Sequence, residues 1–233
     1  MITVIGFDAD DTLWVNEPNY LETEKEFCRM LSAWKPAEET SALLFSTEMA
    51  NLELYGYGAK SFILSMIETA VSVSAGQVGA LTISEITRLG KSLINKDVEL
   101  LDGVEETLQQ LSAGYRLILA TKGDLADQER KLGKSGLEKY FHHIEIMRDK
   151  KDDNYRRLLN HLDIPAADFL MVGNSLKSDI IPVLNLGGHA IHIPYHTTWQ
   201  HEKTDDLPVH PFFTELRTIK QLPQFIATYE SNH

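Results

Sequence analysis

Short apolar runs separated by polar turns recur along the chain. Five of them have the length and composition of buried β-strands, and each is followed by polar or turn-forming residues. They occupy Thr3–Phe7, Tyr115–Ala120, His143–Met147, Phe169–Val172 and Ala190–Pro194. Between the later runs, apolar residues recur every three or four positions, as they do in amphipathic helices. This alternation predicts an α/β fold with three layers, in which a parallel sheet is covered by helices on both faces.

Residues 16–98 show a different pattern. Apolar residues recur there at helical spacing in four stretches, which begin near Leu21, Leu44, Phe62 and Ile83. No good strand pattern appears among them, and the strand–helix alternation resumes near Leu101. We therefore predict a core domain formed by residues 1–15 and 99–233, with residues 16–98 inserted as a helical domain.

The composition narrows the class of protein. The chain has 233 residues, 43% of them hydrophobic, and a formal net charge of −12. That charge argues against nucleic acid or an anionic membrane as the main partner. The acidic N-terminus lacks the features of a signal peptide, and no apolar run is long enough for a membrane span. The single cysteine, Cys28, suits a reducing compartment, so we expect a cytoplasmic protein. We also expect a monomer or a homodimer.

Polar side chains follow the predicted strands at the edge where parallel sheets bind ligands. The residues in question are Asp8, Asp10, Asp11 and Thr12 after the first run, Thr121 and Lys122 after the second, Lys150 and Lys151 after the third, and Asn174 and Asp179 after the fourth. A Mg²⁺ ion between the first and fourth strands would offset the repulsion between Asp8 and Asp179. A lysine and Thr121 could hold a phosphoryl group. Asp8 could attack that group, and Asp10 could carry the proton.

Asp8-Ala9-Asp10-Asp11-Thr12, Thr121, Lys150 and Gly173-Asn174-Ser175 with Asp179 resemble the four ordered motifs of the haloacid dehalogenase (HAD) superfamily. The resemblance implies a Rossmann-like core with a helical cap inserted between the first and second motifs. It also implies that Asp8 is the nucleophile and a Mg²⁺ ligand, that Asp10 is the general acid/base with its backbone carbonyl on the metal, and that Asp179 is a further ligand. Thr121 and a lysine would hold the phosphoryl group.

Three positions shape the choice of activity within that superfamily. Asp10 is similar to the acid that phosphatases and phosphomutases carry and dehalogenases lack, so the resemblance implies a Mg²⁺-dependent phosphatase acting on a small phosphorylated metabolite. Asn174 stands where the family usually has an aspartate, so it could serve as a weaker ligand or stand behind the metal. An asparagine at this position also favours the alternative that the protein is a dehalogenase. Lys122 stands where the family often has asparagine, and it could bind phosphate or point to solvent.

Other functions are compatible with the same sequence features. A 2-haloacid dehalogenase, a phosphomutase or a non-catalytic binding protein would share the fold. The register of the helix that begins near Tyr155 favours Lys150 over Lys151 as the phosphoryl-binding lysine. Asp11 is expected to be a loop or capping acid. The histidine-rich segment 189–201 does not have the spacing of a zinc site, and we expect a loop packed near the site.

Overall fold

The computed structural model describes residues 1–204 and 207–231, which form two compact units. The first unit comprises Met1–Glu17, Val98–Lys122 and Arg130–His233. The second comprises Pro18–Asp97 and the short segment Gly123–Glu129. That segment lies within the stretch that the sequence analysis assigned to the core domain. Among the described residues, no helix is long and apolar enough to cross a membrane.

The strands of the first unit form one six-stranded sheet in which all neighbouring strands are parallel. Their order is β3-β2-β1-β4-β5-β6. They span Val4–Phe7 (β1), Arg116–Lys122 (β2), His143–Met147 (β3), Phe169–Gly173 (β4), His189–His192 (β5) and Phe213–Glu215 (β6). The five predicted strands are confirmed, with ends that shift by at most two residues. The sixth was missed because a strand of three residues is too short to show periodicity.

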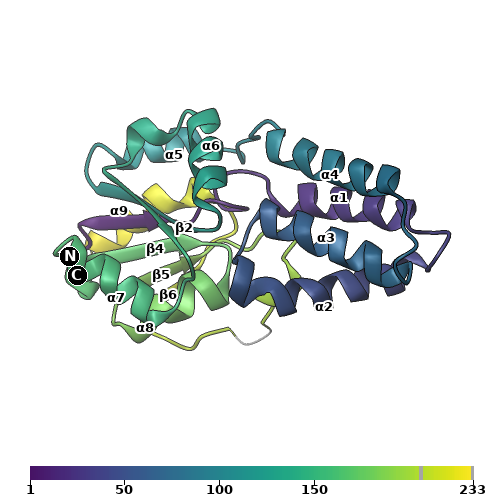
Figure 1. Ribbon diagram of the computed structural model, residues 1–233. Helices are drawn as coiled ribbons and strands as arrows, with labels where there is room; N and C mark the ends of the chain where they lie inside the picture. Colours follow the sequence, from purple (N-terminus) through teal and green to yellow (C-terminus); the bar gives the residue numbers. More distant parts are fainter. Residues whose placement is uncertain (205–206, 232–233) are drawn as a thin grey trace. The chain divides into compact units, whose positions relative to one another are not determined.

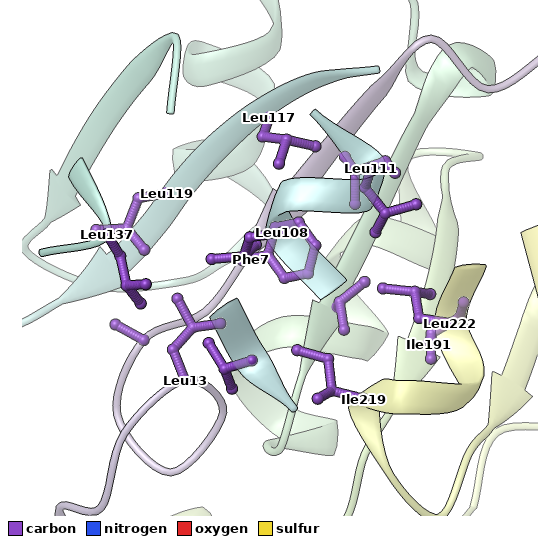
Figure 2. Close-up of a cluster of buried hydrophobic side chains, with 14 of the residues drawn as sticks. Phe7, Leu13, Leu108, Leu111, Leu117, Leu119, Leu137, Ile191, Ile219 and Leu222 are labelled. Carbon is purple, nitrogen blue, oxygen red and sulfur yellow. The ribbon is translucent and has the colours of Figure 1, made fainter. Parts of the chain in front are cut away.

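Alternation along the strands divides the core into two faces. Ile5 and Phe7 of β1 point into one apolar cluster, and Val4 points into another on the opposite face. Figure 2 shows the first cluster, where Phe7 lies among Leu108, Leu119 and other aliphatic side chains. Burial of both faces explains why these strands read as continuous apolar runs.

Helices cover both faces of this sheet, which confirms the predicted α/β class (Figure 1). On the face of Phe7 lie α5 (Val104–Leu111), part of α6 (Leu125–Ser135) and α9 (Leu222–Ser231). On the other face lie α7 (Asp152–His161) and α8 (Ile181–Asn185). Pro182 lies in the first turn of α8, where its missing N–H costs no helical hydrogen bond. Short helical turns span Glu138–Tyr140, Ala166–Asp168, Leu176–Ile180, Gln200–Glu202 and Ile219–Gln221.

The second unit is helical. Its main elements are α1 (Glu17–Met30), α2 (Ala37–Tyr55), α3 (Ala59–Val73) and α4 (Ala80–Asn95), which match the four predicted helical stretches. Its core includes Phe27, Leu44, Phe62 and Ile86. Cys28 is also buried there, and burial, followed by the charge of Glu24, raises the pKa of its thiol to about 11. A thiol with this pKa is unreactive near neutral pH.

Candidate active site

The first strand delivers its acidic residues between two neighbouring strand ends. Phe7, the last residue of β1, pairs with Leu119 of β2 on one side and with Val172 of β4 on the other. The backbone N–H of Asp8 still donates to the carbonyl of Val172 at 2.9 Å. Asp8 therefore leaves the sheet beside the ends of β2, which carries Thr121, and β4.

The backbone turns sharply just after Asp8. Asp11 adopts a left-handed conformation with φ of 62°, which aspartate tolerates better than most residues. Its carboxylate accepts hydrogen bonds from the backbone N–H groups of Asn16 at 2.8 Å and Glu17 at 2.9 Å. These bonds confirm Asp11 as a capping acid at the start of α1. Burial raises the pKa of Asp11 to about 7, and the two backbone bonds act in the opposite direction.

A buried lysine joins the first and third motifs. The ammonium of Lys150 donates to Oδ1 of Asp8 and, at 2.6 Å, to Oδ1 of Asp179. The exposed fractions of Lys150, Asp8 and Asp179 are 2%, 7% and 1%. Lys151 points away, since its side chain is 78% exposed and pairs with Asp149 at 2.8 Å. The structure thus brings Lys150, and not Lys151, to the two carboxylates.

The charges in this cluster do not balance. Burial raises the pKa of Asp8 to about 7, the charge of Asp179 adds to the rise, and Lys150 acts against it. Burial acts to lower the pKa of Lys150, but the charges of Asp179 and Asp8 outweigh it and hold the pKa above its usual value. One ammonium therefore faces two buried carboxylates. The cluster is short of positive charge when both acids are ionised.

Close packing at the end of β4 positions Asp179. The backbone N–H of Ser175 donates to Oδ2 of Asp179 at 3.0 Å, and the N–H of Asp179 returns a bond to the carbonyl of Ser175 at 2.8 Å. A Cβ atom at Gly173 would lie 2.3 Å from Oδ2 of Asp179, so only glycine allows this approach. Gly173 thus matters for the site although it carries no side chain.

Thr12 links the first motif to Asn174. Its hydroxyl lies 3.1 Å from Oδ2 of Asp8 and 3.3 Å from the side-chain oxygen of Asn174. A single hydroxyl proton serves one acceptor at a time. The Asn174 amide can instead turn its N–H₂ group toward Thr12, which leaves the Thr12 proton for Asp8. A carboxylate at position 174 could not donate in this way.

Asp10 lies outside the lysine-centred cluster. Its Oδ1 accepts a hydrogen bond from the indole N–H of Trp14 at 2.7 Å and another from the ammonium of Lys131 at 2.9 Å. Lys131 also lies 3.1 Å from Oδ2 of Asp10 and 2.8 Å from the side-chain oxygen of Asn16. The carboxyl of Asp10 is therefore held by two donors, neither of which the sequence analysis identified.

Lys122 at the end of β2 is engaged by Glu202. Its ammonium forms an ion pair with Glu202 and donates to the hydroxyl of Ser178 at 2.9 Å. Ser175 and Ser178 donate to the same carboxylate at 2.5 Å and 2.6 Å. Burial acts to raise the pKa of Glu202, but Lys122 and the two hydroxyls outweigh it and lower the pKa to about 2. Glu202 directly follows the histidine-rich segment 189–201, so the end of that loop packs at this edge as expected.

The oxygen donors suit a hard divalent cation. Two buried carboxylates, Asp8 and Asp179, share one ammonium, and the pKa of Asp8 is raised first by burial and then by the charge of Asp179. Carboxylate and carbonyl oxygens are the ligands that Mg²⁺ takes in proteins. In the described part of the chain, no three histidine, cysteine, aspartate or glutamate side chains converge to form a metal site. Backbone oxygen and water would have to complete the ligand set.

Comparison with known proteins places this geometry in a family. A model of the haloacid dehalogenase-like hydrolases matches residues 2–187. The chain belongs to this family. A crystal structure of a haloacid dehalogenase-like family hydrolase from Xanthomonas campestris has a TM-score of 0.89 and 36% identity, and the match covers 99% of this chain and 93% of that one. The resemblance inferred from the four motifs is confirmed, and the chain is a hydrolase of this family.

Two curated relatives are similar at lower identity. The Escherichia coli protein named 5-amino-6-(5-phospho-D-ribitylamino)uracil phosphatase YigB is 24% identical over 221 residues, or 88% of this chain and 86% of the relative. The Mus musculus N-acylneuraminate-9-phosphatase is 31% identical over 104 residues, or 42% of each chain.

The residues that the sequence analysis missed are far in sequence from the residues that they contact. Lys131 and Glu202 reach the site from 121 and 80 positions away from their partners Asp10 and Lys122. Neither lies next to one of the four family motifs. Lys131 lies in the charged stretch LADQERKLGKS, which forms α6. That concentration of charge just after the second motif is the feature of the sequence that could have drawn attention to Lys131.

Proposed function

We propose that this hydrolase is a Mg²⁺-dependent, cytoplasmic phosphatase that acts on a small phosphorylated metabolite through an aspartyl-phosphate intermediate. One observation carries the proposal: the buried ammonium of Lys150 is ion-paired with both Asp8 and Asp179 at the end of the central strands. With a divalent cation to offset the excess negative charge, such a site would neutralise and position a dianionic phosphoryl group, which is most of what phosphoryl transfer requires of an enzyme.

In the first step, a carboxylate oxygen of Asp8 attacks phosphorus while the bond from phosphorus to the leaving oxygen breaks. Asp10 gives its proton to that oxygen, so that an alcohol leaves. In the second step, Asp10 takes a proton from water as the water attacks phosphorus, and Asp8 is released as a carboxylate. Lys150 holds the attacking carboxylate, and the buried hydroxyl of Thr121 is assigned to the phosphoryl oxygens.

The carboxylates of Asp8 and Asp179 and the backbone carbonyl of Asp10 would hold Mg²⁺, and Asn174 would support these ligands. When bound, the ion supplies positive charge that offsets the charge of the phosphoryl group. The protein's own contribution is to fix these oxygens. Ser175 and Gly173 do so for Asp179, and Thr12 does so for Asp8.

The names of the two curated relatives support the reaction class, because both denote phosphatases. The same names support a small phosphorylated metabolite as the substrate class. The site agrees with this class, because Lys150 and Thr121 are groups that can hold a phosphoryl group. The predicted helical cap, residues 16–98, is assigned the choice of the rest of the substrate.

Hydrolysis of 4-nitrophenyl phosphate with and without Mg²⁺ tests the proposal. We expect turnover by the wild type that needs Mg²⁺ and that falls by at least ~10³-fold in Asp8→Asn, which loses the nucleophile. Asp102→Asn provides a control for the charge change, because its side chain is 89% exposed. Turnover without metal, or full activity in Asp8→Asn, would contradict the proposal. Metal-independent halide release from a 2-haloacid would instead indicate a dehalogenase.

A further inference from the structure

Lys131 carries a largely buried positive charge that has no role in the reaction proposed above. Its ammonium lies 2.9 Å and 3.1 Å from the two carboxylate oxygens of Asp10, and 2.8 Å from the side-chain oxygen of Asn16. All three residues belong to the first unit. The ammonium thus has acceptors that match the three hydrogens it can donate.

The surroundings fix this lysine more firmly than an ordinary surface ion pair. The side chain of Lys131 is 18% exposed, and that of Asp10 is 23% exposed. The next residue in α6, Leu132, is buried in the apolar cluster that also contains Trp14. Trp14, which is 1% exposed, donates to Oδ1 of Asp10 at 2.7 Å. Because the donors come from two packed elements, the carboxyl of Asp10 is held in one orientation.

An acid/base carboxyl benefits from such a cation in a specific way. When Asp10 gives its proton to the leaving oxygen, it becomes a carboxylate, and the nearby ammonium stabilises the charge that develops. A proton on Oδ2 replaces only one contact to Lys131 and leaves the two bonds to Oδ1 in place. The held carboxylate is then oriented to accept a proton from water in the second step.

We propose that Lys131 is a positioning residue for Asp10, which orients the acid/base carboxyl for proton transfer. This inference rests on the proposed function. It assigns a role to a residue outside the four family motifs, on a helix that sequence periodicity did not predict.

The test compares two aryl phosphates. Phenyl phosphate has the more basic leaving group and depends more on proton donation than 4-nitrophenyl phosphate does. For Lys131→Met we expect kcat/KM for phenyl phosphate to fall about 10- to 100-fold, with the loss in kcat rather than KM, and kcat/KM for 4-nitrophenyl phosphate to fall less than about threefold. Lys131→Arg keeps the cation and is expected to recover most of the loss. Lys134→Met, an exposed lysine on the same helix, is the matched control.

A double-mutant cycle separates action through Asp10 from a general structural effect. In the Asp10→Asn background, Lys131→Met is expected to change kcat/KM for phenyl phosphate by less than about twofold, because the group it positions is gone. Thermal unfolding of each variant checks folding, and Lys131→Gln replaces Lys131→Met if that variant does not fold.

Equal losses on both substrates, or additive losses in the cycle, would overturn the role of Lys131 while leaving the phosphatase proposal intact. Failure of the wild type to hydrolyse either substrate would overturn the proposed function, and the role of Lys131 with it.

Discussion

The ammonium of Lys150 forms a buried ion pair with the carboxylate of Asp8. Removing one partner of a buried pair leaves the other charge uncompensated, which typically costs about 3–5 kcal/mol. We expect Lys150→Met to lower the free energy of unfolding by about 2–4 kcal/mol at neutral pH. The cost lies at the low end because Asp8, whose pKa is already raised to about 7, can take up a proton. Urea unfolding measures the change.

Lys151→Met serves as the matched control. Its ammonium is exposed and pairs with Asp149, so its removal is expected to change stability by less than about 0.5 kcal/mol. The same two variants are expected to differ in activity, with a loss of at least about 100-fold for Lys150→Met alone. Similar losses in both variants would contradict the assignment of Lys150.

The ion pair between Lys122 and Glu202 bears on whether Lys122 binds phosphate. Because Glu202 and Ser178 engage its ammonium, we expect Lys122→Met to change KM for an aryl phosphate by less than about threefold. In urea unfolding, Lys122→Met and Glu202→Gln are expected to show a coupling energy of about 1–2 kcal/mol. The exposed pair of Lys139 and Glu105 is the reference, and we expect its stabilities to be nearly additive. A large rise in KM with additive stabilities would show that Lys122 binds the substrate.

The second unit contains an acid whose ionisation opposes folding. Glu48 of α2 is partly buried, and burial, followed by the charge of Glu24, raises its pKa from 4.5 to about 8. The folded state therefore favours the protonated form. This contribution to stability is present below about pH 4.5 and is lost as the pH rises through about 8.

We expect Glu48→Gln to be more stable than the wild type by about 1–2 kcal/mol at pH 8.5 and equally stable at pH 4. The change is followed by thermal unfolding in circular dichroism. Glu53→Gln removes an exposed acid from the same helix and is expected to show little dependence on pH. A stability difference for Glu48→Gln that stays constant between pH 4 and pH 8.5 would contradict the prediction.

Periodicity predicted the elements that carry a strong local signal. The strands β1 and β4 read as apolar runs because both of their faces are buried. The four helices of α1–α4 have apolar residues at helical spacing. By contrast, β6 has only three residues, and α6 is rich in charge. Their identity depends on tertiary packing, which a local window does not contain.

In the candidate site, too, some residues could be predicted from local sequence and others could not. Asp8, Lys150 and Asp179 follow the strands β1, β3 and β4, so parallel topology brings them to one edge of the sheet. The partners of Asp10 and Lys122, by contrast, come from distant segments. Lys131 reaches Asp10 and Glu202 reaches Lys122 through long side chains whose direction the sequence does not encode locally. The positions of charged groups could be inferred, but the pairing that sets their charge state could not.

The covalent intermediate on Asp8 is the most direct test of the account. The protein is mixed with a phosphorylated substrate and Mg²⁺, quenched in acid within one turnover, and treated with borohydride, which reduces an aspartyl phosphate to homoserine. Peptide mass spectrometry then reads the residue at position 8. We predict homoserine there in the wild type and unmodified asparagine in Asp8→Asn. Phosphate release by an active wild-type enzyme in which Asp8 stays unmodified, or in which another residue is reduced, would contradict the account.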